Sequence, residues 1–231
     1  TKPIVIAKLQ SLGATVIVHG KNWNAADAFV QSQLDDPTIA YVPPYEHELL
    51  WTGHSTIIDE IYQDLVDAEM STILVSVGGG GLLSGILEGL ERNKKMNVRV
   101  IAAETTGANC FNAAMTSGHV TTLDSIDSVA TSLGALSCSE TALQRAIKYK
   151  NVESITCTDQ EAIDAILQFS RDHRLLVEPA CGAALAMLYS ERLRSSLLLK
   201  KKDGPVVVQV CGGSGVNLEL LQQWKNDFGL L

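Results

Sequence analysis

Charged side chains are scarce in this sequence of 231 residues, and basic ones are the scarcer kind. Charged residues make up 19% of the chain and hydrophobic residues 46%, and the formal net charge is −8. This balance supports a sizeable buried core and argues against disorder. The basic run at residues 200–202 is followed by Asp203 and Gly204, which is typical of a solvated loop. Nucleic acid is therefore not an expected partner.

Long apolar runs and paired cysteine motifs are also missing. Glycines and charges interrupt every apolar run before it reaches the length of a membrane span, so no membrane partner is expected. The cysteines are odd in number, contain no C-x-x-C pair, and favour neither a disulfide framework nor a zinc site. They are Cys110, Cys138, Cys157, Cys181 and Cys211. A reducing compartment, the cytoplasm, is the expected location.

Four consecutive glycines form the most informative stretch, which we call the glycine turn. They are Gly78, Gly79, Gly80 and Gly81. The apolar, β-branched run at 73–77 predicts a buried strand, and the spacing of leucine and isoleucine over 82–90 predicts an amphipathic helix. A strand–glycine–helix unit exposes backbone N–H groups at the positive end of the helix dipole, which favours a phosphate site. The alternative is a tight turn without a ligand.

The glycine turn does not match either common nucleotide pattern. No Lys-Ser or Lys-Thr pair follows it, as a mononucleotide loop requires, and its glycines are contiguous instead of spaced as in a dinucleotide fingerprint. The expected phosphate therefore belongs to another kind of ligand.

Strand and helix patterns alternate along the chain, which predicts an α/β fold with a parallel sheet. Helices are predicted at 2–12, 22–34 with Asn24 as N-cap, 54–68, 82–90, 109–117, 140–150, 162–171, 183–193 and 218–228. Strands are predicted at 14–18, 38–42, 73–77, 98–103, 152–157 and 205–210. Two strands make only a thin sheet, so residues 1–44 are interpreted as an incomplete small domain and 45–231 as a large ligand-binding domain. A capping box is predicted at residues 158–161.

A second glycine-bearing turn follows the last predicted strand, and we call it the thiol turn. It comprises Cys211, Gly212, Gly213 and Ser214. Ligands of open α/β sheets bind where parallel strands end, so both turns are expected to open onto one edge. The thiol turn offers a thiol and a hydroxyl on backbone that a flat ring can approach. The alternatives are a small buried cysteine and a helix N-cap serine.

Three motifs together resemble the L-serine dehydratases, also called L-serine/L-threonine ammonia-lyases. They are Ser76-Val77-Gly78-Gly79-Gly80-Gly81-Leu82, Glu178-Pro179-Ala180-Cys181-Gly182-Ala183-Ala184 and Val210-Cys211-Gly212-Gly213-Ser214. The segments Trp51-x-Gly53-His54 and Ser132-Leu133-Gly134 are similar to the family as well. The resemblance implies a three-layer, tryptophan-synthase-β-like fold, the fold type II of enzymes that depend on pyridoxal 5′-phosphate (PLP).

The resemblance also implies how the cofactor is held. The glycine turn and Leu82 match the phosphate loop, and Cys211 with Gly212 matches the wall beside the pyridine nitrogen. A neutral thiol there makes the ring a weaker electron sink than a carboxylate would, which favours prompt loss of the β-hydroxyl. Serine racemases and biosynthetic threonine deaminases typically carry serine at the position of Cys211.

A monovalent-cation site is implied next to the phosphate loop. Glu104 is similar to the carboxylate ligand of the family, and backbone carbonyls would complete an all-oxygen shell suited to K⁺. The carbonyls are those of Gly78, Ala108, Leu133 and Ala135. The alternative for Glu104 is a carboxylate that merely stabilises the start of a helix.

The Schiff-base lysine of the family has no counterpart in this sequence. Lys2, Lys8 and Lys21 lack its sequence context and are interpreted as solvated, so no catalytic residue is assigned here and the lysine is expected upstream of Thr1. The chain is thus interpreted as the C-terminal portion of a longer enzyme, a homodimer that deaminates L-serine, and also L-threonine, to pyruvate or 2-oxobutanoate plus ammonia. The alternatives are a serine racemase, a β-replacement enzyme and a non-catalytic fragment of the PLP fold.

Overall fold

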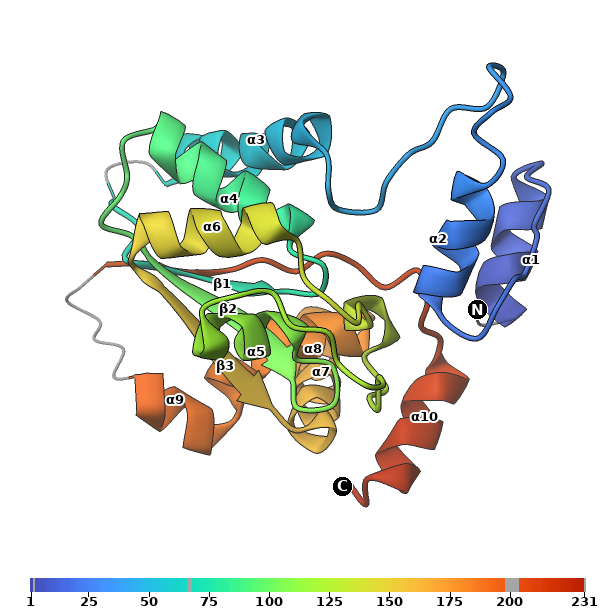
Figure 1. Cartoon of the computed structure of the whole chain (residues 1–231). Helices are drawn as coiled ribbons and strands as arrows, with labels where there is room; N and C mark the ends of the chain where they lie inside the picture. The colour runs from blue at the N-terminus through green and yellow to red at the C-terminus, as the bar shows by residue number, and fades with distance from the viewer. Residues whose placement is uncertain (2, 66–67, 198–203, 231) are drawn as a thin grey trace. The chain divides into compact units, whose positions relative to one another are not determined.

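Four parallel strands form the sheet of the computed structural model, which describes residues 1, 3–65, 68–197 and 204–230 (Figure 1). The strands are β1 (Thr72–Ser76), β2 (Arg99–Thr105), β3 (Val152–Cys157) and β4 (Val206–Val208). Their order is β3-β2-β1-β4, so β1 pairs with β2 on one side and with β4 on the other. The predicted parallel sheet is confirmed, although the predicted strand at 205–210 is shorter and the one at 98–103 extends through Glu104 to Thr105.

Helices cover both faces of this sheet and make three layers, as predicted. The side chains of β1 and β2 alternate between the layers: Leu74 and Ile101 face one apolar cluster, while Ile73 and Val100 face the other. The first layer contains α7 (Asp159–His173) and α8 (Pro179–Tyr189). The second contains α3 (Glu48–Asp64), α4 (Gly81–Arg92), α5 (Cys110–Ser117) and α6 (Glu140–Tyr149). Figure 1 shows α3, α4 and α6 on the opposite side of the strands from α7 and α8.

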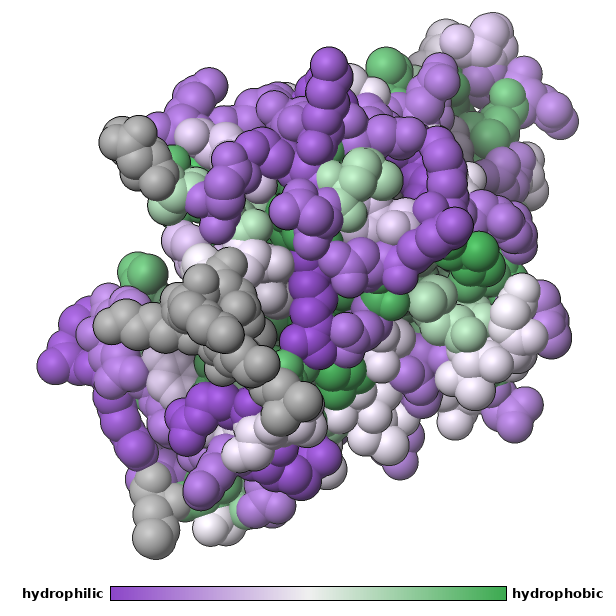
Figure 2. Space-filling model, turned by 90° about the vertical axis from the view of Figure 1, so that its left-hand side faces the viewer, coloured by the Kyte–Doolittle hydropathy of each residue, from purple (hydrophilic) through white to green (hydrophobic). Residues whose placement is uncertain are grey.

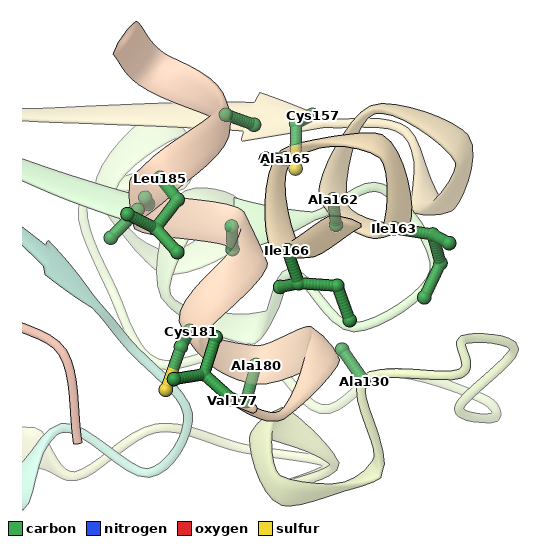
Figure 3. Close-up of a cluster of buried hydrophobic side chains, with 14 of the residues drawn as sticks. Ala130, Cys157, Ala162, Ile163, Ala165, Ile166, Val177, Ala180, Cys181 and Leu185 are labelled. Carbon is green, nitrogen blue, oxygen red and sulfur yellow. The ribbon is translucent and has the colours of Figure 1, made fainter. Parts of the chain in front are cut away.

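Small residues let α8 approach α7 and the sheet closely. Figure 3 shows the packed side chains, with Ala162, Ala165 and Ile166 facing α8. A Cβ atom added at Gly182 would lie 2.3 Å from the carbonyl oxygen of Ala162, so any larger residue would push the two helices apart. Every residue of α8 from Pro179 to Met187 is buried. This helix carries one side of the cavity described below and is held rigidly.

The helices begin at residues that cap them. The predicted capping box of α7 is confirmed: Thr158 accepts a hydrogen bond from the Glu161 amide, and the Glu161 side chain accepts one from the Thr158 amide. Ser139 caps α6 by accepting from the Ala142 amide. Asn217 caps α10 (Leu218–Asp227), so the alternative of Ser214 as a helix N-cap is wrong.

Several predicted boundaries move. The helix expected at 54–68 begins earlier, at Glu48, because His47 caps it, and residues 66–67 of that prediction lie outside the described residues. The helix expected at 183–193 begins at Pro179, a residue pre-set for a first helical turn, and ends at Tyr189 before α9 (Glu191–Leu197). A short 3₁₀ helix spans Thr131–Leu133.

The chain folds into two compact units, Thr1–Pro43 and Pro44–Leu231. The smaller unit contains α1 (Pro3–Ser11) and α2 (Trp23–Gln31), which Asn22, not the predicted Asn24, caps. The strands predicted at 14–18 and 38–42 are wrong. A strand needs a neighbour for its backbone groups, but in the described residues neither segment pairs in a sheet, and Ile17 and Val18 are 67% and 63% exposed.

The surface carries both hydrophilic and apolar side chains (Figure 2). The molecular face drawn in Figure 2 is mostly hydrophilic and is interrupted by apolar patches. Among the described residues, no helix combines the length and the apolar character needed to cross a membrane. The basic run at 200–202 lies outside the described residues.

Candidate active site

A cavity of about 460 Å³ opens where β1 and β4 end. Both glycine-bearing turns line it, so two segments far apart in sequence lie at one edge of the sheet. The further lining residues are Pro44, Tyr45, His54, Ser76, Val77, Leu82, Leu83, Ser132, Leu133, Glu178, Ala180 and Cys181. The parallel pairing of β1 with β4 causes this meeting, because it places the carboxyl ends of both strands together.

The first amides of α4, at the end of the glycine turn and directly after it, belong to residues that line the cavity. Gly80 is the N-cap of α4 and has φ +96°, a conformation that favours glycine. The first amide of α4 that donates within the helix is that of Ser84, to the Gly80 carbonyl at 2.9 Å. The amides at 81–83 therefore have no acceptor inside their own helix. They lie at the positive end of the helix dipole, where an anion is stabilised.

Close packing on the other sides explains why this turn carries no side chains. A Cβ atom at Gly80 would lie 2.5 Å from the Ala142 Cβ, and one at Gly79 would lie 2.2 Å from the Tyr45 ring. The Gly79 carbonyl accepts a hydrogen bond from the Ser139 amide at 2.8 Å, which ties the turn to the start of α6. Tyr45 is a lining residue that our sequence analysis missed. The only available signal was an aromatic residue directly after Pro43 and Pro44.

The thiol turn forms the opposite wall. Gly212 has φ +151°, and apart from its two chain neighbours no residue lies within 4 Å of the position that a Cβ atom would take there. The cavity is therefore open over this backbone, as the approach of a flat ring requires. Cys211 is exposed, so the alternative of a small buried cysteine does not describe it.

Glu178 holds the thiol turn in place. Its amide donates to the Gly212 carbonyl at 3.0 Å, and its carboxylate accepts from the Gly215 amide at 2.9 Å. The other carboxylate oxygen accepts from the Ser132 hydroxyl at 2.5 Å. Glu178 and Ser132 belong to motifs of the sequence for which no role was predicted. A glutamate directly before Pro179 at a helix start was the signal for one.

Cys181 lies between the two turns. Its sulfur lies 3.4 Å from the Gly212 carbonyl oxygen. A hydrogen bond from Cys211 lowers the pKa of Cys181 to about 6 in spite of burial. The same contact raises the pKa of Cys211, so Cys211 is the protonated partner of the pair.

Glu104 is fully buried at the end of β2, behind the glycine turn. One carboxylate oxygen accepts from the Phe111 amide at 2.9 Å and the other from the Asn112 amide at 2.6 Å, so Glu104 stabilises the start of α5. Burial raises the pKa of Glu104 to about 8, although these amide bonds oppose the shift. The helix-start alternative describes its hydrogen bonds, and the predicted role in binding K⁺ stays a prediction.

Of the other predicted cation ligands, Gly78 and Ala135 both lie close to Leu133. A Cβ atom at Gly78 would lie 3.1 Å from the Leu133 Cα, and the Ala135 amide donates to the Leu133 carbonyl at 2.8 Å. The Cys110 thiol reaches the Gly78 carbonyl at 3.5 Å, and Ala108 is buried shortly after Glu104. In the part of the chain that the structure describes, no cluster of three or more His, Cys, Asp or Glu side chains could hold a metal ion.

No lysine is among the lining residues in the described part of the chain. Lys8 lies in α1 and Lys21 directly precedes the cap of α2, both in the smaller unit, and Lys2 lies outside the described residues. The cavity thus combines an anion-binding turn with a ring-sized opening but carries no amine nucleophile of its own.

The comparison with known proteins identifies the class. The chain belongs to the pyridoxal-phosphate dependent enzyme family, whose sequence model matches residues 1–212. Its fold is that of the fold-type II members, a parallel α/β sheet in three layers.

Within this family the chain is similar to serine dehydratases. It is 38% identical over 234 residues to an L-serine dehydratase of Saccharomyces cerevisiae (strain AWRI1631). The matched region covers 95% of this chain and 69% of the yeast protein. It is 40% identical over 228 residues to the serine dehydratase-like protein of Homo sapiens, covering 97% and 69%. The crystal structure of a fungal L-serine ammonia-lyase from Rhizomucor miehei superimposes with a TM-score of 0.88 at 33% identity, covering 99% of this chain and 72% of that one.

Proposed function

We propose that this chain forms the cofactor-binding part of an enzyme that deaminates L-serine, and also L-threonine, by PLP-dependent β-elimination. The products are pyruvate or 2-oxobutanoate and ammonia. The observation that carries the proposal is the meeting of the glycine turn and the thiol turn in one cavity, in a chain whose relatives are serine dehydratases.

The residues of the cavity fit PLP. The amides at 81–83, with the glycine turn and Leu82, would bind the phosphate, because they are unpaired within α4 and carry the positive end of its dipole. The open space over Gly212 would admit the pyridine ring, with the Cys211 thiol beside its nitrogen. When bound, PLP supplies an electron sink for negative charge on the α-carbon of the substrate.

The protonation state of Cys211 affects how strongly the ring withdraws electrons. The hydrogen bond of Cys211 to Cys181 raises the pKa of the Cys211 thiol, which stays neutral at physiological pH. A neutral thiol is a weak hydrogen-bond donor and stabilises a protonated ring less than a carboxylate would. Negative charge on the α-carbon is then relieved by loss of the β-hydroxyl instead of by reprotonation, which favours deamination over racemisation.

The glycine turn positions the reacting groups. Gly80 and Gly79 are packed against Ala142 and Tyr45, so the turn has little freedom to move. A phosphate anchored there would fix the ring between the two turns and restrict the substrate to one orientation. The lysine that would carry the cofactor and take the α-proton is proposed to come from a segment ahead of Thr1.

A K⁺ ion is proposed at Glu104. The carboxyl group is fully buried and accepts two amide bonds, and burial raises its pKa to about 8, so it carries little charge near neutral pH unless a cation accompanies it. A buried carboxylate is costly unless a counter-charge accompanies it. A cation held between Glu104 and the carbonyls of Gly78, Ala108, Leu133 and Ala135 would supply that charge behind the phosphate turn.

A cytoplasmic homodimer is the proposed form of the complete enzyme. The five cysteines are unpaired in the structure, as a reducing compartment requires. Light scattering of the purified enzyme tests the dimer, and fractionation of cells tests the compartment.

The experiment for the reaction measures products from L-serine with the complete enzyme. Pyruvate should form without any added nucleophile, and D-serine should remain a minor product. D-serine in excess of pyruvate would instead indicate a racemase, and a requirement for an added thiol would indicate a β-replacement enzyme. The chain alone should bind pyridoxine 5′-phosphate, which lacks the aldehyde, and should not be fixed to PLP by borohydride at any lysine.

A further inference from the structure

Two thiols with opposite accessibility share the cavity. Cys181 lies in the first turn of α8 and is 3% exposed, whereas Cys211 is exposed, and both line the cavity. The Cys181 sulfur lies 3.4 Å from the carbonyl oxygen of Gly212, the residue directly after Cys211, so the two thiols are neighbours at the thiol turn. In Figure 3 this sulfur points away from Ile166 and α7.

The surroundings of Cys181 differ from those of the other buried cysteines. Cys157 lies under α7, and burial raises its pKa to about 12. Cys138 is likewise raised, to about 11. Cys181, in contrast, receives a hydrogen bond from Cys211, which favours its thiolate. A thiolate next to a second thiol in a solvent-accessible cavity is the arrangement found at redox-sensitive cysteines.

We propose that Cys181 and Cys211 are a redox pair that a peroxide converts into an intramolecular disulfide. The Cys181 thiolate attacks one oxygen of hydrogen peroxide, the O–O bond breaks, and the released hydroxide takes a proton to become water. Cys211 sulfur then attacks the resulting sulfenic acid, an S–S bond forms, and hydroxide leaves with the Cys211 proton as a second water. Two thiols are oxidised and one peroxide is reduced, so atoms and electrons balance.

The disulfide would close the cavity to the cofactor. It removes the Cys211 thiol and draws the thiol turn toward α8. The open space over the backbone of Gly212 is then reduced. Conversely, a ring bound over Gly212 would cover Cys211 and slow its oxidation. This coupling rests on the proposed cofactor site, whereas the disulfide itself depends on the contact of the Cys181 sulfur with the thiol turn.

The test treats the reduced, cofactor-free chain with hydrogen peroxide and measures intact mass and non-reduced peptide maps. The expected product has lost two hydrogen atoms, contains a crosslink between the Cys181 and Cys211 peptides, and reverts on addition of a dithiol reductant. Pre-incubation with saturating pyridoxine 5′-phosphate should slow crosslinking at least severalfold. An unchanged rate would overturn the coupling to the cofactor site.

Two variants keep the test decisive. Cys181→Ser should abolish the crosslink and leave Cys211 to be oxidised singly, whereas Cys157→Ala, the matched control at a buried cysteine outside the cavity, should form the crosslink as the wild type does. Single oxidation of Cys211 in the wild type, or a crosslink to any other cysteine, would overturn the proposal. Because the readout is mass, absence of serine deamination would count against the proposed function and leave the disulfide untouched.

Discussion

Glu178 links Ser132 to the thiol turn through the two oxygens of one carboxylate. Ser132 donates its hydroxyl hydrogen at 2.5 Å, and the Gly215 amide donates at 2.9 Å. The 3₁₀ helix, the start of α8 and the thiol turn therefore meet at a single side chain that lines the cavity. Glu178 needs no contact with the substrate to matter, because it determines where Cys211 and Gly212 stand.

Replacing Glu178 tests this arrangement. Glu178→Ala removes two hydrogen bonds to a charged acceptor, and we expect affinity for pyridoxine 5′-phosphate to fall by about tenfold. Fluorescence titration of the purified chain measures it. Glu91→Ala, which removes an exposed carboxylate paired with Lys148 at 2.7 Å, is the control and should leave affinity unchanged. Equal affinities in both variants would show that Glu178 does not position the site.

Two glycines with positive φ separate backbone strain from steric clash. Gly80→Ala adds a methyl group 2.5 Å from the Ala142 Cβ at φ +96°, while Gly118→Ala, at φ +77°, meets no atom within 4 Å. We expect Gly118→Ala to lower the free energy of unfolding by about 1 kcal/mol and Gly80→Ala by about 2–4 kcal/mol. Urea denaturation measures both. Equal losses would mean that the glycine turn yields to side chains.

Glu104→Ala should affect both stability and the response to K⁺. It leaves the buried amide of Phe111 and the half-buried amide of Asn112 without an acceptor, at a cost of about 1–3 kcal/mol. It also removes the charged ligand of the proposed cation site, so the rise in unfolding temperature on replacing a large organic cation with K⁺ should disappear. The control is Glu153→Ala, an exposed partner of Arg99. If Glu104→Ala keeps the full response to K⁺, Glu104 serves only the start of α5.

Glu161 gives a pH-dependent contribution to stability. Burial raises its pKa, but bonds from Arg192, from the Thr158 amide and from Ser190 outweigh burial and bring the pKa down to about 2. A carboxylate with a depressed folded pKa stabilises the native state above its ordinary pKa, and this contribution is lost as pH falls through the folded value. Glu161→Gln should therefore cost about 1 kcal/mol at pH 7. The difference from wild type should shrink below about pH 4.5. Urea denaturation across that range checks the sign, and a constant difference would contradict it.

Cys211 should set the balance between products in the complete enzyme. Cys211→Ser keeps a neutral group of similar size and should change the rate of pyruvate release only modestly. Cys211→Asp places a carboxylate beside the ring nitrogen, which stabilises its protonated form and prolongs negative charge on the α-carbon. The ratio of D-serine to pyruvate, measured by chiral chromatography, should then rise. An unchanged ratio in an enzyme that still binds PLP would place Cys211 away from the ring.

The sequence was informative where local patterns and tertiary packing agree. The strand at 73–77, the glycine turn and the capping box at Thr158 each depend on neighbours in sequence, and the structure places them within one or two residues. The strands predicted at 14–18 and 38–42 had the right residues but lacked a neighbour to pair with. β-propensity alone cannot supply that partner.

The two turns of the site could be predicted from the sequence, but the residues that pack against them could not. Glycine and cysteine motifs mark the two walls, whereas Tyr45, Ser132 and Glu178 reach them from segments whose distance in space no periodicity encodes. The hydrogen bond between Cys181 and Cys211 is of the same kind, since each residue alone is an ordinary free cysteine.

The position of β4 beside β1 has a consequence for the order of folding. The anion-binding turn is built from contiguous residues, whereas its facing wall depends on Thr72 pairing with Val206, a contact of long sequence separation. Such contacts form late, because the intervening chain must first be ordered. During synthesis the glycine turn therefore emerges before β4, the last strand of the sheet, has been made. A cofactor that contacts both turns can therefore bind only after β4 has joined the sheet.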